Sequence, residues 1–88
     1  MPARIVLVHD QQGFVGELAT LLRLAGHQVA TFTDPMEAWG ALEAARQIEV
    51  LVTSMGFQPG RSNGVALASM ARSNRPGIRV LFIALPEY

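Results

Sequence analysis

Three polar residues follow two apolar segments of this sequence and are the first candidates for chemistry. His9 and Asp10 come directly after the apolar run 5–8, and Ser54 follows the run 50–53. If both runs are parallel strands of one sheet, they end at the edge where open α/β proteins bind ligands. A histidine, a carboxylate and a hydroxyl at that edge are the side-chain types of a cation site, a phosphorylation site or a Ser–His–Asp triad.

The same three residues are a poor set for each of these tasks. Mg²⁺ prefers several oxygen ligands, so Asp10, as the single metal candidate, predicts weak binding and no resident cofactor. A serine hydroxyl needs an adjacent base, and His9 belongs to the other strand. Because side chains alternate along a strand, Asp10 is predicted to point away from His9, which argues against a triad. We expect a neutral, hydrogen-bonded His9 and a Ser54 hydroxyl that closes its strand.

The composition excludes several other classes of function. The chain has 88 residues, half of them apolar and 16% charged, which indicates one folded domain over 1–88 and not a disordered chain. Seven arginines balance seven acids, so no net charge attracts nucleic acid or a membrane surface. The sequence has no lysine and no cysteine, which excludes Schiff-base lysines, disulfides and thiolate chemistry. No apolar stretch reaches the ~18 residues of a membrane span, so we expect a soluble, cytoplasmic protein.

Strand patterns alternate with helix patterns along the whole chain. The expected strands are 4–8, 28–32, 48–53 and 79–84, and the expected helices are 13–25, 34–45 and 63–74. Gly26 is a typical helix stop, and Asp34 followed by Pro35 is a typical helix start. This alternation with short links predicts a parallel sheet with helices packed on it.

The spacing of apolar residues predicts which side of each helix faces the sheet. In the first helix the inward side is expected to carry Phe14, Leu18, Leu21, Leu22 and Ala25. In the third it is expected to carry Val65, Ala68, and Ala71 or Met70. His27 is expected to be exposed in a turn, and Trp39 is expected to pack in the core.

The order and spacing of these segments resemble the receiver domain of two-component response regulators, the CheY-like family. The stretches that carry the resemblance are RIVLVHD, LLRLAGHQVATFTDPMEA, the third strand with its loop to Pro59 and Gly60, NGVALASMAR, and RPGIRVLFIALPEY. The resemblance implies a flavodoxin-like α/β fold, a three-layer sandwich around a parallel sheet of strand order 2-1-3-4. It covers a receiver as far as the fourth strand, without the usual fifth strand and last helices.

The resemblance also implies where a phosphorylation site would lie. In that family two acids after the first strand hold Mg²⁺, and an aspartate after the third accepts the phosphoryl group. A hydroxyl after the fourth strand responds to it, and a lysine pairs with it. These positions fall on His9 and Asp10, on Ser54, and on Ile83, and the lysine has no counterpart. Only Asp10 keeps the family's residue type, so the pocket is expected to be degenerate. Met55 and Phe57 of the next loop are expected to plug it, with a surface that faces a partner as the alternative.

The expected function is therefore that of a phosphorylation-independent pseudo-receiver, which is not an enzyme and acts as an interaction or dimerisation module. Its partner would be a signalling protein, such as a histidine kinase or an output domain, or a second copy of itself. If the chain is naturally 88 residues long, an exposed apolar edge at the fourth strand predicts a homo-oligomer, and the alternative is that the sequence is cut from a longer protein. Two alternatives remain open. One is a small-molecule sensor or enzyme that uses the crevice, and the other is a receiver phosphorylated on Ser54 or His9.

Overall fold

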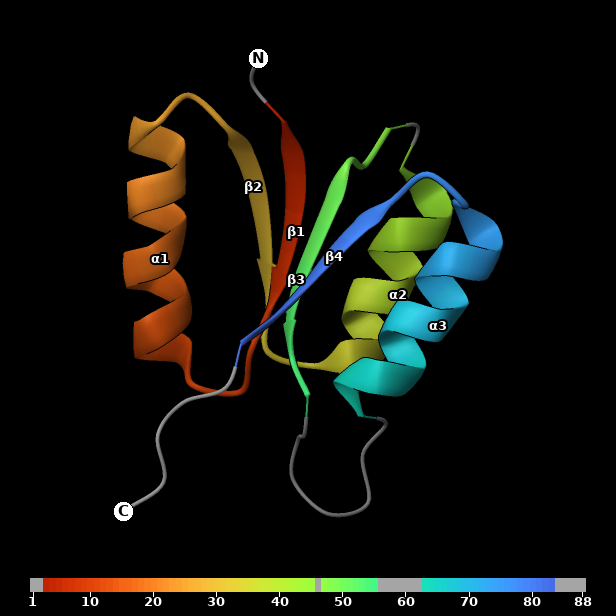
Figure 1. The fold of residues 1–88 in the computed structure, drawn as a ribbon. Coiled ribbons are helices and arrows are strands. Elements are labelled where there is room, and N and C mark those ends of the chain that lie inside the picture. The colour runs from red at the N-terminus through yellow and green to blue at the C-terminus, as the bar shows by residue number, and fades with distance from the viewer. Residues whose placement is uncertain (1–2, 46, 56–62, 84–88) are drawn as a thin grey trace.

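The computed structural model describes residues 3–45, 47–55 and 63–83 (Figure 1). Strands and helices alternate as predicted. They are β1 (Arg4–Val8), α1 (Gln12–Leu24), β2 (Gln28–Phe32), α2 (Pro35–Ala44), β3 (Val50–Ser54), α3 (Gly64–Asn74) and β4 (Arg79–Ile83). The third strand begins two residues later than predicted, because Ile48 packs against the apolar core instead of joining the ladder. Phe57, Pro59, Gly60 and Ala84 lie outside the described residues.

The four strands form one parallel sheet in the order β2-β1-β3-β4, which confirms the flavodoxin-like topology. Val8 of β1 lies opposite Phe32 of β2 on one side and opposite Thr53 of β3 on the other. The carboxyl ends of β1 and β3 are therefore neighbours at one edge of the sheet. The residues that follow these two strands form the site described below.

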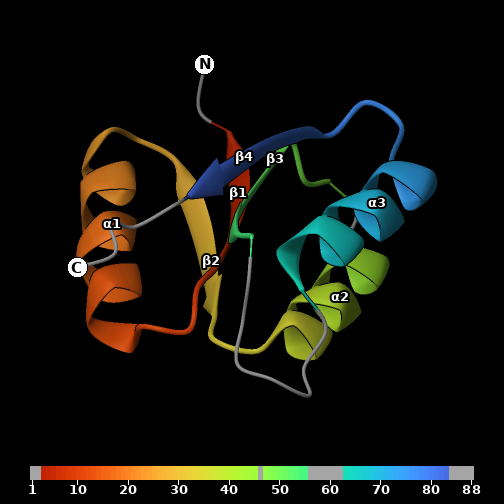
Figure 2. The same cartoon turned by 60° about the horizontal axis from the view of Figure 1, so that its bottom comes forward.

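Helices cover both faces of the sheet, as Figures 1 and 2 show from two directions. Helix α1 covers one face, and α2 and α3 lie together on the other. β1 is buried between them, because Ile5 and Leu7 pack toward α1 while Val6 and Val8 pack toward α2 and α3. Burial on both faces explains why β1 is a continuous apolar run and not an alternating one.

The sides of α1 and α3 that face the core differ in part from the prediction. In α1 the buried residues are Val15 and Ala19, flanked by Leu18 and Leu22, whereas Leu21 and Ala25 are exposed. The small Ala19 lets the helix lie close to the sheet, while Phe14 packs against His9 at the helix start. The side of α1 that faces the sheet is thus shifted by about one residue from the predicted side.

In α3 the prediction was right for Ala68 and Ala71 and wrong for Val65, which is exposed. Leu67, which the pattern did not single out, is fully packed in the core. The reason is that α3 contacts both the sheet and α2, so its buried stripe faces between the two. Trp39 of α2 packs partly buried against the same cluster, which confirms its expected packing role.

The ends of the helices follow the predicted signals. The Asp34 carboxylate accepts a hydrogen bond of 2.9 Å from the Met36 backbone N–H, and Pro35 takes the first helical position of α2. Gly26 ends α1 with a φ of 96°, a conformation that favours glycine. His27 was expected to be exposed, but it is half-buried and its Nδ1 accepts a bond of 3.0 Å from the Ala3 N–H. It therefore ties the start of the chain to the α1–β2 turn.

Within the part of the chain that the structure describes, β4 is an edge strand with no neighbour on its outer side. Leu81 is 59% exposed and Phe82 is 39% exposed, so both faces of this strand carry uncovered apolar side chains. The prediction of an exposed apolar edge is thus confirmed for these residues. No helix of the described residues is long and apolar enough to cross a membrane.

Candidate functional site

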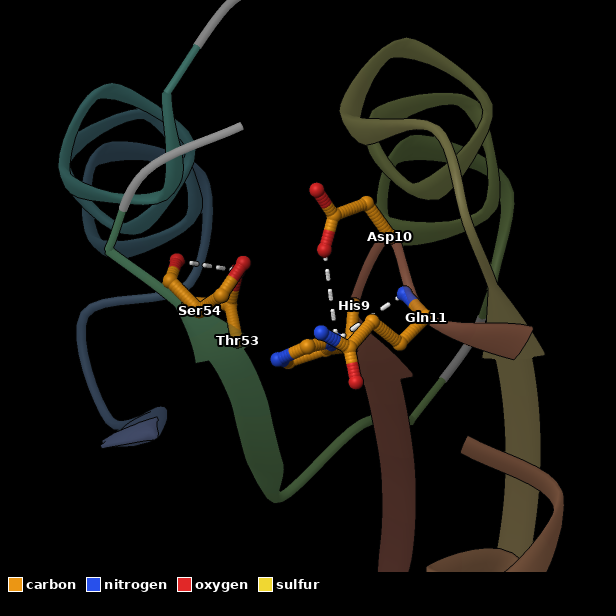
Figure 3. A network of polar contacts seen from close by, with 5 residues as sticks. All are labelled: His9, Asp10, Gln11, Thr53 and Ser54. Carbon is orange, nitrogen blue, oxygen red and sulfur yellow. Dashed lines mark hydrogen bonds and ion pairs between the residues drawn. The ribbon is translucent and has the colours of Figure 1, made fainter. Parts of the chain in front are cut away.

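His9 joins the end of β1 to the start of α1. Its backbone N–H donates to the carbonyl oxygen of Phe32 at 3.1 Å, which extends the pairing of β1 with β2 by one residue. The side chain is only 4% exposed, and its Nδ1 accepts a hydrogen bond of 3.0 Å from the Gln11 N–H (Figure 3). The imidazole also packs against the Phe14 ring, with centroids 4.9 Å apart. His9 is therefore a packed, hydrogen-bonded side chain, as expected.

The Gln11 hydrogen bond fixes where the His9 proton lies. A ring nitrogen that accepts an N–H carries no proton, so a neutral His9 holds its proton on Nε2. The Asp10 carboxylate lies 3.4 Å from the same Nδ1. Two acceptors that face each other form no hydrogen bond, so this approach becomes an ion pair only when His9 is protonated.

The prediction that Asp10 points away from His9 was therefore wrong. Strand alternation does not apply to this pair, because β1 ends at Val8 and both residues lie in the turn before α1. Another feature of His9 is incompatible with a triad. In a triad the histidine Nδ1–H donates to the carboxylate, whereas here Nδ1 accepts from Gln11.

At the end of β3, Thr53 and Ser54 are buried beside the start of α3. The Thr53 hydroxyl donates to the Ser54 carbonyl oxygen at 3.0 Å, and Ser54 is only 6% exposed (Figure 3). Among the described residues no fully buried side-chain polar atom lacks a hydrogen-bond partner. The third strand thus ends in two hydroxyl residues and not in a carboxylate.

Gly64 allows α3 to begin directly against this strand end. Its N–H donates to the Met55 carbonyl oxygen at 2.9 Å. A Cβ at this position would overlap the Ser54 carbonyl oxygen and approach the Thr53 hydroxyl to 2.9 Å. Only glycine fits there, a requirement that the Asn63–Gly64 pair did not reveal in the sequence because it reads equally as a helix start. The Asn63 carboxamide caps the helix, accepting from the Ala66 N–H at 2.7 Å.

The donor groups at this edge do not fit the Mg²⁺ ion that the family resemblance implies. Asp10 supplies one carboxylate, exposed on a turn. Asp34, which follows β2, already accepts the Met36 N–H. Among residues 3–45, 47–55 and 63–83, no group of three acidic, histidine or cysteine side chains could hold a metal ion. A hard cation with one carboxylate ligand keeps most of its water and binds weakly.

Ile83 and Met55, two of the residues predicted to lie at the pocket, differ in their packing. Ile83, at the switch position, lies opposite Ser54 in the ladder and packs against the cluster under α1. It is a packing residue, as its apolar side chain predicted. Met55 was expected to plug the pocket or to face a partner; its side chain is 51% exposed, which fits the second expectation and not the first. Phe57, the other predicted plug, is not among the described residues.

Two hollows occur elsewhere on the described surface. One of about 400 Å³ is open to solvent between α2 and α3, and is lined by Trp39, Ser69, Met70, Ser73 and Asn74. Another of about 310 Å³ lies at the amino ends of β1 and β2, where Arg4 and Gln28 line it. Neither contains His9, Asp10 or Ser54, so neither supports a ligand site at the predicted crevice.

Comparison with solved structures decides the family. The receiver domain of the hybrid histidine kinase CckA superposes on this chain with a TM-score of 0.79 and is 31% identical, over 90% of this chain and 72% of that one. The chain belongs to the receiver-domain family of two-component signalling. No family model matches the sequence of this receiver.

Two further proteins are similar to this receiver. Protein RcaC of Microchaete diplosiphon is 30% identical over 87 residues, which make up 97% of this chain and 13% of that protein. The chain therefore spans a small part of that relative. A CheY-like response regulator receiver domain protein from Methanospirillum hungatei JF-1 superposes over 100% of this chain and 68% of its own, with a TM-score of 0.87 at 17% identity. That likeness confirms the CheY-like fold.

Proposed function

We propose that this receiver works without phosphoryl transfer and transmits its signal by binding another protein. The observation that carries the proposal is the residue at the end of β3. The family resemblance places the phosphoacceptor there, and this chain has Ser54, a buried hydroxyl beside a hydrogen-bonded Thr53. A hydroxyl needs a base to become a nucleophile, and the proton-accepting atom Nδ1 of His9 already accepts the Gln11 N–H.

The rest of the site supports the same proposal. Asp10 alone offers little for Mg²⁺, the cation that would neutralise a phosphoryl group. Ile83 packs where a hydroxyl would respond to that group. Each of these substitutions removes a polar or charged group, and each side chain present has a packing or hydrogen-bonding role of its own.

Phosphorylation of His9 or Ser54 by a kinase is the weaker alternative. Both side chains are more than nine-tenths buried, so a kinase would reach them only after the end of the sheet had opened. A phosphoryl group on His9 Nδ1 would also displace the Gln11 hydrogen bond. The two hollows described above lie away from the carboxyl ends of β1 and β3, so neither supports a small-molecule or enzymatic role there. We therefore expect no catalytic turnover.

The partner that this proposal implies is a protein of the signalling apparatus, such as a histidine kinase or an output domain, or a second copy of the receiver. No net charge directs the chain toward nucleic acid or a membrane surface. The exposed apolar side chains of β4, Leu81 and Phe82, are the surface that a protein partner would cover.

The proposal is tested by backbone amide NMR spectra of the ¹⁵N-labelled chain, recorded with and without a small phosphodonor and Mg²⁺. We expect the amide signals of Asp10, Gln11 and Ser54 to stay in place, because no site forms for the cation or the phosphoryl group. The matched variant is Ser54→Asp, which restores a carboxylate at the end of β3 and is expected to show Mg²⁺-dependent shifts at Asp10. Saturable shifts of these signals in the unmodified chain would contradict the proposal.

A further inference from the structure

The outer edge of β2 presents backbone groups in a defined pattern. The Gln28 N–H donates to the Ala3 carbonyl oxygen at 3.0 Å. At the other end of the strand the Phe32 carbonyl oxygen accepts from the His9 N–H at 3.1 Å, so both ends of β2 bond toward β1. Because backbone groups alternate in direction along a strand, those of residues 29 and 31 point to the other side. Among the described residues no strand lies on that side of β2.

One of these outward groups already has a partner. The Arg23 guanidinium donates from Nη2 to the Val29 carbonyl oxygen at 2.8 Å. Arg23 is exposed and belongs to the last turn of α1, so its charge lies against the outer side of β2. The segment 28–33 itself has no charged residue and no proline, which are common means of keeping an edge strand unpaired. The charge that protects this edge therefore comes from the neighbouring helix.

We propose that Arg23 keeps the outer edge of β2 from pairing with a second copy of this chain. Without the guanidinium, two copies of β2 pair antiparallel across a two-fold axis at Ala30, the middle residue of the strand. Val29 of one copy then faces Thr31 of the other, and each of the two facing pairs exchanges two hydrogen bonds. In each pair one of these bonds runs from the Thr31 N–H to the Val29 carbonyl oxygen, the acceptor that Arg23 occupies.

The size and the charge of the guanidinium both oppose this pairing. A guanidinium is larger than a backbone N–H, and at 2.8 Å from the Val29 oxygen it stands where the second strand would lie. In the paired strands the two Val29 residues are diagonal neighbours, about 7–8 Å apart. Two guanidinium groups held at these residues repel each other, because this separation is no longer than the Debye length of about 8–10 Å.

The side chains of β2 suit a second copy once the charge is removed. On the side of α1, the β-branched Val29 and Thr31 face each other across the strands, which is a favourable pair. On the other side Ala30, which is exposed and small, meets Ala30 of the second copy and allows a close approach. The contact involves five residues of each copy, less than a stable interface needs, so pairing is expected to increase with protein concentration.

This inference goes beyond the proposed function and does not rest on it, since it involves none of the side chains of His9, Asp10 and Ser54. An arginine that only tied α1 to β2 would raise the free energy of unfolding and would leave the association of two copies unchanged. The experiment therefore measures association at β2 and not stability.

The test is disulfide formation at Ala30→Cys in the full chain, which has no cysteine of its own. Adding Arg23→Met, which keeps the side chain's length and removes its donors, is expected to raise the rate of covalent dimer formation at least about tenfold. Adding Arg23→Lys, which keeps the charge, is expected to leave the rate low. The control is Ser73→Cys, exposed on α3, whose rate is expected to be the same with and without Arg23→Met.

Light scattering keeps the proposal testable if a cysteine variant folds poorly. Arg23→Met is expected to have a higher mass than the unmodified chain at the same concentration, and adding Thr31→Pro is expected to reverse this. Proline lacks the outward N–H that would donate to the second copy, and β1 loses no hydrogen bond. Equal rates at Ala30→Cys with and without Arg23, an equal rise at Ser73→Cys, or a mass that Thr31→Pro does not lower would each overturn the proposal.

Discussion

The His9 side chain makes two contacts at the start of α1. It accepts the Gln11 N–H at 3.0 Å, and it lies against the Phe14 ring. The Gln11 side chain makes no capping hydrogen bond, and α1 has no acid in its first turn. His9 therefore supplies the kind of side-chain acceptor that a capping residue usually provides at a helix start. We propose that a residue that stabilises the fold stands here, where the family resemblance places an acid that helps to bind a cation.

This role predicts different costs for two substitutions of His9. His9→Ala loses the hydrogen bond, worth about 0.5–1.5 kcal/mol, and a ring contact of similar worth, so the free energy of unfolding is expected to fall by roughly 1–3 kcal/mol. In His9→Asn the amide oxygen can take the place of Nδ1, so about half of the loss is expected to be recovered. Urea unfolding followed by circular dichroism measures both.

An equal loss in the two variants would show that the Gln11 hydrogen bond contributes nothing. No loss in either would show that His9 is not a structural residue, and its burial would then need another explanation. Gln12→Ala, at an exposed position at the start of the same helix, is the control for helix effects unrelated to His9.

At the scale of elements, Arg75 connects the end of α3 to the end of α2. Its guanidinium donates to the Leu42 carbonyl oxygen from Nε at 3.1 Å and from Nη2 at 2.9 Å, and it also donates to the Ala45 carbonyl oxygen. These are carbonyls at the carboxyl end of α2, where a positive charge is favourable and no basic residue of α2 is present. Arg75 thus fixes the two helices that cover one face of the sheet.

Replacing Arg75 by methionine keeps much of the side chain's apolar length and removes the donors. Hydrogen bonds to a charged group contribute about 1.5–3 kcal/mol, so Arg75→Met is expected to lower the free energy of unfolding by that amount. The matched control is Arg72→Met, since Arg72 is exposed on the same helix and is expected to change stability little. The measurement is urea unfolding of both variants, and equal stabilities would contradict the role given to Arg75.

Most of the elements could be predicted from local signals in the sequence. The apolar run of β1, the Asp34–Pro35 helix start and Gly26 each depend on their immediate neighbours, and each was correct. The inward sides of α1 and α3 were partly wrong, because they depend on what lies beside the helix. Phe14 packs against the His9 ring, and α3 contacts both the sheet and α2.

The sequence predicted which residues lie at the candidate site, but it did not predict the contacts that they make. The order of the segments placed His9, Asp10 and Ser54 at neighbouring strand ends, and the parallel register of β1 and β3 confirms this. The direction of Asp10 was wrong because it belongs to a turn and not to a strand. The exposure of Met55 and the close approach of Gly64 to the end of β3 depend on tertiary contacts. A local residue pattern does not reveal such contacts.

The whole molecule is a receiver domain whose sheet ends in packing residues where the family resemblance expects a phosphorylation site. Its core covers both faces of β1, while Leu81 and Phe82 leave both faces of β4 uncovered. We propose that these apolar side chains belong to a surface that binds a protein, and that the site at the ends of β1 and β3 accepts no phosphoryl group.

The most direct measurement is the intact mass of the chain after incubation with a small phosphodonor and Mg²⁺. A receiver with an aspartate at the end of its third strand, treated in the same way, shows that the reagent is active. We predict that the mass of this chain does not change, because Ser54 and His9 are buried and Asp10 belongs to no metal-binding group of acidic side chains among the described residues. One added phosphoryl group, mapped by fragmentation to His9, Asp10 or Ser54, would contradict it.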